Sequence, residues 1–177
     1  MLQQAWVACV KASGDTLKVA PYSREKLREL TGQLSERACS PEEFASFQGS
    51  FAEVGVKLIY VEAFPKEKLD GSALIVGETP LIGISGRGKR LDKALFTRLY
   101  ETAHVLLGHV STDGVVIVDD LSEAGQDEEG DADRLAGELA ILGPLPAVVE
   151  NYPGSRRAHC SPTVTDQLER WTAFVNA

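Results

Sequence analysis

Cysteine and histidine are scarce in this sequence, and neither forms a familiar metal-binding or redox pair. The chain has three cysteines and three histidines among 177 residues. The cysteines, Cys9, Cys39 and Cys160, are widely spaced, and no two of them form a CxxC pair. An odd number of isolated cysteines favours reduced thiols over a disulfide framework or a cysteine-based zinc site.

Long apolar runs and an excess of basic residues are also missing. No window approaches the ~18 apolar residues of a membrane span, and Met1 is not followed by a basic segment leading into an apolar signal core. We therefore expect a cytoplasmic protein without membrane contact. The 18 basic residues are outnumbered by 26 acidic ones, giving a formal net charge of -8. Because phosphate binding needs clustered Lys and Arg, we expect no direct nucleic-acid binding by this chain.

What the sequence does contain is enough apolar material for a folded core, 44% of all residues. Helical periodicity and capping residues predict three helices in the first third of the chain. Ser23 is placed as an N-cap, and Ser40-Pro41 followed by Glu43 is a strong helix start. The expected helices cover residues 2–12, 24–39 and 41–54.

The middle of the chain switches to strand-forming residues. Residues 56–64 are rich in β-branched and aromatic side chains, and a short glycine-containing loop joins residues 72–76 to 80–85 as an antiparallel hairpin. Further elements are expected at 91–109 (helix), 115–118 (short strand or buried loop), 128–142 (helix), 143–162 (proline-rich connection) and 164–175 (helix). The fold class is α+β, with a small antiparallel sheet packed by helices.

The stretch from Leu91 to His109 carries the most suggestive chemistry. On a helix, Tyr100 and His104 are four residues apart and share a face, with Glu101 beside them. In an HExxH motif, two histidines at this spacing hold a zinc ion and the intervening glutamate is the general base. Here tyrosine stands in the first histidine position. Glu129, in the downstream acidic helix, could supply a further ligand.

These two segments together resemble the ImmA/IrrE family of zinc metallopeptidase-like domains. That family typically reads FTxAHExGHxLLH and then ExxAxxFAxxLLxP, and this chain has FTRLYETAHVLL followed by EGDADRLAGELAILGP. The resemblance covers about residues 50–146 and implies a zincin-like fold. The AWVACV segment near the N-terminus is similar to the lead-in that joins such domains to a helix-turn-helix repressor in phage regulators and HigA-like antitoxins.

Carried over residue by residue, the resemblance implies that Glu101 is the catalytic glutamate and that His104 and Glu129 are metal ligands. Tyr100 takes the place of the first histidine. A phenol with a reference pKa near ~10 is a poor zinc ligand at neutral pH, so we expect zinc binding to be severely weakened. His109 would lie on the wrong face of the helix to replace the missing ligand, unless the helix ends at Gly108.

Two functions follow from the resemblance and both stay open. One is a degenerate metallopeptidase domain that acts as a sensor or interaction module, with a repressor, a toxin or its own DNA-binding domain as the protein partner. The other is an active zinc endopeptidase that cleaves a repressor. A weaker third idea is an anion site in the basic loop Gly86 to Arg90. The expected organisation is a helical segment (1–54), a metallopeptidase-like core (55–146), and a connection with a C-terminal helix (147–177).

Overall fold

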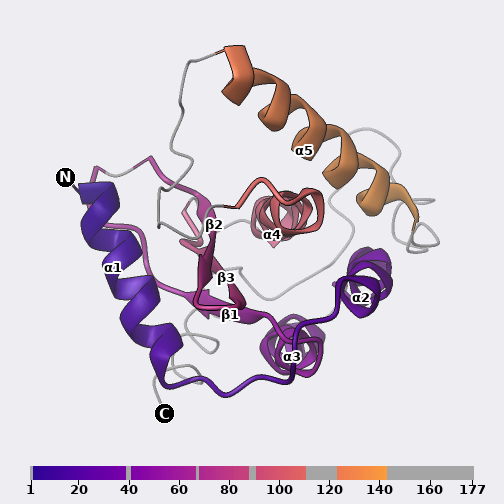
Figure 1. The fold of residues 1–177 in the computed structure, drawn as a ribbon, viewed down its shortest axis with the longest axis horizontal. Helices are drawn as coiled ribbons and strands as arrows, with labels where there is room; N and C mark the ends of the chain where they lie inside the picture. The colour runs from indigo at the N-terminus through magenta and orange to yellow at the C-terminus, as the bar shows by residue number, and fades with distance from the viewer. Residues whose placement is uncertain (1, 39–40, 67, 88–90, 111–122, 143–177) are drawn as a thin grey trace.

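The fold was obtained as a computed structural model, which describes residues 2–38, 41–66, 68–87, 91–110 and 123–142. It combines helices with one three-stranded sheet (Figure 1). In chain order the elements are α1 (Leu2–Asp15), α2 (Arg24–Arg37), α3 (Pro41–Glu53), β1 (Lys57–Tyr60), β2 (Gly71–Val76), β3 (Thr79–Ile84), α4 (Leu91–Leu107) and α5 (Glu123–Leu142). The α+β class expected from the sequence is confirmed.

The sheet is mixed, which corrects the expectation of an antiparallel sheet. Its strand order is β1-β3-β2, so β3 is central. The hairpin of β2 and β3 is antiparallel, as expected, but β1 runs parallel to β3 with Leu58 opposite Ile82. After β1 the chain crosses to the far edge of the sheet and forms β2. The hairpin then places β3 between β1 and β2, antiparallel to β2 and therefore parallel to β1. The strand expected over 56–64 is accordingly only four residues long.

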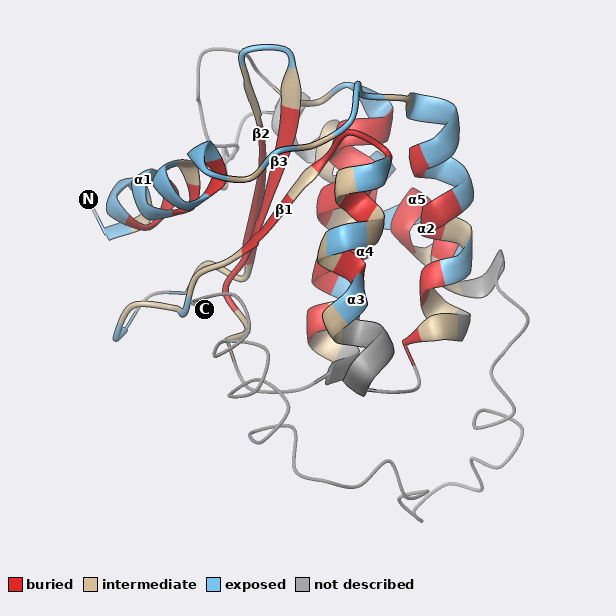
Figure 2. Ribbon diagram, turned by 90° about the horizontal axis from the view of Figure 1, so that it is seen from below, coloured by how far each residue is buried: buried red, intermediate tan, exposed pale blue. Residues whose placement is uncertain are grey.

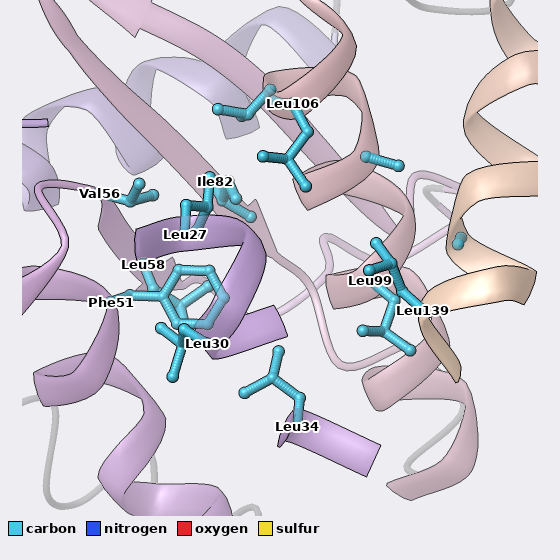
Figure 3. Packing of buried hydrophobic residues seen from close by; sticks show 14 of the residues in the cluster. Leu27, Leu30, Leu34, Phe51, Val56, Leu58, Ile82, Leu99, Leu106 and Leu139 are labelled. Carbon is cyan, nitrogen blue, oxygen red and sulfur yellow. The ribbon is translucent and has the colours of Figure 1, made fainter. Parts of the chain in front are cut away.

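Both faces of the sheet are buried, and alternate side chains along each strand point to opposite layers. Helices α2, α3, α4 and α5 lie on one face and α1 lies on the other, as Figures 1 and 2 show together. On the multi-helix face, Leu58, Ala73 and Ile82 join the larger apolar cluster, whose packing with the helices is shown in Figure 3. The sheet therefore divides two separate apolar layers.

Helix α1 covers the opposite face through a tightly fitted tryptophan. Trp6 and Val10 are fully buried against Leu74 and Leu81. The indole Nε1 of Trp6 donates a hydrogen bond to the Val61 carbonyl at 2.9 Å. These contacts dock α1 on the sheet, and its outer side, including the free thiol of Cys9, is exposed.

Helices α3 and α4 both end in a Schellman motif built on a glycine with positive φ. At the end of α4, Gly108 has a φ of 80° and its N–H donates to Val105, while the N–H of His109 donates to the His104 carbonyl at 3.0 Å. Gly55 ends α3 in the same way, with a φ of 85°. A side chain at Gly55 would also collide with the backbone of Tyr22, so this join requires glycine.

Most expected helices are present with shifted ends. Helix α1 runs to Asp15, beyond the expected residue 12, and α5 begins at Glu123, ahead of the expected residue 128. The cap expected at Ser23 is confirmed, because its hydroxyl accepts from the Lys26 N–H. The elements expected at 115–118, 143–162 and 164–175 lie outside the described residues, as does His159. Among the residues described, no helix is both long and apolar enough to cross a membrane.

The expected boundary at residues 54 and 55 falls in the tight turn between α3 and β1. The larger apolar cluster contains Leu27 and Phe51 from the N-terminal side of this boundary as well as Leu99 and Leu139 from the other side (Figure 3). The two segments therefore share one core. The division of the chain into functional segments stays a prediction.

Candidate functional site

One face of α4 presents a row of ring side chains spaced one helical turn apart. The rings of Phe96 and Tyr100 stack with centroids 6.3 Å apart, and the Tyr100 and His104 rings meet edge to face at 4.9 Å. This is the geometry of side chains four residues apart on a helix. The expectation that Tyr100 and His104 share a face is confirmed.

Helix α5 packs beside α4 and brings Glu129 to this row. The Tyr100 hydroxyl donates a hydrogen bond to Glu129 Oε2. The other carboxylate oxygen, Oε1, lies 3.7 Å from His104 Nε2. Glu129 therefore faces both residues of the α4 row, and three of the four site residues expected from the sequence come together across two helices.

The fourth expected residue, Glu101, lies beneath the start of β2 with only 8% of its surface exposed. A Cβ atom added to Gly71 would lie 2.7 Å from Glu101 Oε1, so only a glycine lets the strand pass this close to the carboxyl group. Burial, reinforced by the nearby charges of Glu129 and Asp70, raises the pKa of Glu101 to about 8. A buried acid that titrates near neutral pH is typical of functional sites.

Tyr100 and His104 are held in their uncharged forms. Burial and the hydrogen bond to Glu129 raise the pKa of the Tyr100 phenol well above its usual value. Burial lowers the pKa of His104, although the charge of Glu129 opposes this shift. At neutral pH, Tyr100 is thus a hydrogen-bond donor, and the imidazole of His104 is neutral.

A carboxylate that the sequence did not single out, Asp70, lies at the same end of β2. Its two oxygens accept from Arg87 Nε and a terminal guanidinium nitrogen at 2.7 and 2.9 Å, and Lys93 Nζ lies 2.8 Å from Oδ1. Partial burial alone would raise the pKa of Asp70, but the hydrogen bonds from Arg87 and Lys93 hold it below its usual value. Arg87, which lies in the basic loop considered as a weaker idea for an anion site, is paired with Asp70.

These side chains surround a cavity of about 400 Å³ between β2, α4 and α5. That volume suits a small ligand or a single inserted side chain. Every site residue expected from the sequence contributes to its wall. The wall of the cavity includes Asp70, Gly71, Lys93, Phe96, Tyr100, Glu101, His104 and Glu129.

His109 lies close to this group because α4 ends before it. The Schellman motif at Gly108 turns the chain back, and the His109 ring is 5.6 Å from the His104 ring. The Nδ1 atoms of both histidines are buried and have no hydrogen-bond partner among the described residues. The sequence predicted that His109 would lie near the site only if the helix ended at Gly108. The helix does end there, and His109 lies near the site.

Tyr100 takes the position of the first histidine of an HExxH zinc site. His104 and Glu129 face each other. The Tyr100 phenol, however, donates a hydrogen bond to Glu129, so one of the carboxylate oxygens is already engaged. Within the part of the chain that the structure describes, no group of three or more His, Cys, Asp or Glu side chains is arranged to hold a metal ion. Zinc usually takes histidine, cysteine or carboxylate ligands.

Sequence reasoning missed the contribution of β2 to the site. Asp70 and Gly71 belong to no motif, and their only signal is the Asp-Gly pair that marks a turn before a strand. Phe96 has a detectable signal, since it lies four residues before Tyr100. Comparisons of the chain with protein-family models, with curated proteins and with solved structures found no match.

Proposed function

We propose that this chain is a degenerate ImmA/IrrE-like metallopeptidase domain, with a zincin-like fold, that acts as a sensor or protein-interaction module of a regulator. A repressor, a toxin or a DNA-binding domain of the same protein is the partner class. The arrangement of α4 and α5, which brings an ExxH segment to a glutamate on a neighbouring helix, supports the family assignment.

The observation that carries the proposal is the hydrogen bond from Tyr100 to Glu129. A glutamate that serves as a metal ligand needs free oxygen lone pairs directed at the ion. Here one oxygen accepts from the phenol and the other faces the neutral His104 imidazole. The Tyr100 phenol thereby occupies one oxygen of Glu129, and the cavity remains as a place for a ligand or for a partner's side chain.

Metal analysis of protein purified without chelator tests the proposal. We expect zinc and manganese far below about one ion per chain, with the same low content in His104→Ala. A stoichiometric zinc content that His104→Ala removes, together with cleavage of a repressor, would contradict a degenerate site.

The second candidate is an active endopeptidase, favoured by one observation. Glu101 is a buried cavity residue whose pKa of about 8 suits a general base at neutral pH. In that case Glu101→Gln abolishes proteolysis while the circular dichroism spectrum stays unchanged. Proteolysis that persists at the wild-type rate in Glu101→Gln would exclude this mechanism.

A further inference from the structure

The carboxyl group of Glu101 is an unsatisfied acceptor in the cavity. It is more than nine-tenths buried and lines the cavity wall, yet no described side chain or backbone group donates a hydrogen bond to it. Its neighbour Gly71 contributes no side chain. Buried carboxyl groups are normally paired or hydrogen-bonded, because burial without a partner is costly.

Among the described residues, the cations that line this cavity or pair with Asp70 beside it are engaged with Asp70 or exposed to solvent. Lys93 and Arg87 both bind Asp70. Lys68, which also lines the cavity, is exposed. Glu129 adds a second carboxylate on the opposite wall, and its charge is felt at Glu101. Among the described residues, no cation is therefore paired with the Glu101 carboxyl group.

Aromatic surface lies beside these acceptors. Phe96 lines the cavity with 42% of its surface exposed, and its ring stacks on the ring of Tyr100. Aromatic faces attract organic cations, and carboxylates accept their N–H bonds. A ligand that matches both features is an organic cation with N–H donors.

We infer that the cavity binds an organic ammonium group, which donates hydrogen bonds to Glu101 and Glu129 and lies beside the Phe96 and Tyr100 rings. The inference rests on the proposed function, since a bound metal ion would use the same carboxylates. The ammonium group belongs either to a small free amine or to a lysine side chain of the protein partner. Both sources share the same chemistry in the cavity.

Calorimetric titration of the purified chain, after its metal content has been measured, tests the inference. The probes are putrescine, as a free amine, and Nα-acetyl-lysine amide, as a lysine side chain, each with an uncharged counterpart, 1,4-butanediol or Nα,Nε-diacetyl-lysine amide. At about pH 9, above the Glu101 pKa of about 8, the carboxyl group is ionised, and we expect at least one amine to bind with its affinity reduced about tenfold or more in Glu101→Gln. Binding of putrescine alone assigns the site to free amines, and binding of the lysine derivative alone assigns it to a partner side chain.

The matched control is Glu78→Gln, which removes the same charge from the exposed β2–β3 turn and should leave binding unchanged. If Glu101→Gln does not fold, Glu129→Gln takes its place, with the same expected loss. Absence of amine binding to metal-free protein, or equal binding of the uncharged analogues, overturns this inference alone. Stoichiometric zinc in the starting protein overturns the proposed function instead.

Discussion

The hydroxyl of Tyr100 on α4 donates a hydrogen bond to the carboxylate of Glu129 on α5. This bond joins the two helices at the wall of the cavity. An intact HExxH site has its first histidine at the position of Tyr100 and a downstream glutamate ligand at the position of Glu129. The bond links these two positions. In this chain the contact between the two positions is direct, from the phenol to the carboxylate.

Removal of the Tyr100 hydroxyl should weaken the contact between α4 and α5. We expect Tyr100→Phe to lower the free energy of unfolding by about 1 kcal/mol, because a half-buried hydrogen bond to a carboxylate is lost. Urea denaturation measures this change. Tyr22→Phe is the control: Tyr22 is an exposed tyrosine outside the cavity, and we expect a change within about 0.5 kcal/mol. Equal effects of the two substitutions would show that the Tyr100–Glu129 bond does not stabilise the fold.

Glu101 should make stability depend on pH between about 4.5 and 8. Its pKa is higher in the folded chain than the ordinary value of 4.5, so the folded state holds the proton more tightly. Stability from this group is full below the unfolded pKa and is lost as pH rises through the folded pKa, by an amount on the order of a few kcal/mol.

Glu101→Gln cannot ionise and should remove this decline. Denaturation midpoints at several pH values, compared with those of the exposed-turn variant Glu78→Gln, measure the effect. A wild-type profile that Glu101→Gln leaves unchanged would mean that the Glu101 carboxyl group is not buried as an acid.

The close passage of β2 over Glu101 makes Gly71 sensitive to any side chain. In Gly71→Ala, the new methyl group would lie 2.7 Å from Glu101 Oε1 and from Thr97 Cγ2. We expect a loss of about 1–3 kcal/mol from this overpacking. Gly137→Ala on α5, where the added Cβ has nothing within 4 Å, is the contrast and should gain about 0.5–1 kcal/mol. A neutral Gly71→Ala would contradict the tight contact.

Local signals in the sequence were sufficient for the helices and for the row of residues on α4. Ser23 as a cap, the Pro41 start and the glycine stop at Gly55 act within a few residues, so each can be recognised without tertiary information. The helix expected over 91–109 ends earlier, at Leu107, because of Gly108. The spacing of Tyr100 and His104 is likewise a property of any helix. The meeting of these residues with Glu129 was expected from the family resemblance, and the structure confirms their proximity.

The errors arose where tertiary contacts decide the outcome. Residues 61–64 have strand-like composition, but Val61 and Phe64 pack against the apolar layer that contains Trp6. The Val61 N–H still donates to the Ile84 carbonyl of β3, yet the strand ends at Tyr60. The parallel pairing of β1 with β3 depends on the path of the whole connection, which no local pattern records. Asp70 joined the site because the Ser85 hydroxyl and N–H bind Leu69 and Asp70 across the sheet edge. The start of α5 was predicted at residue 128 and lies at Glu123, because the acidic residues of its first turns have a composition typical of a solvated loop.

The most direct test of the central claim is the zinc affinity of the wild-type chain compared with Tyr100→His, measured by competition with a chelating dye. Restoring the imidazole should supply the missing ligand and free Glu129, so we expect zinc to bind at least about a hundredfold more tightly, beyond the usual effect of outer-shell changes. Tyr22→His adds the same group away from the cavity and should change nothing. Wild-type protein that binds zinc as tightly as Tyr100→His would contradict a site closed by Tyr100 and Glu129.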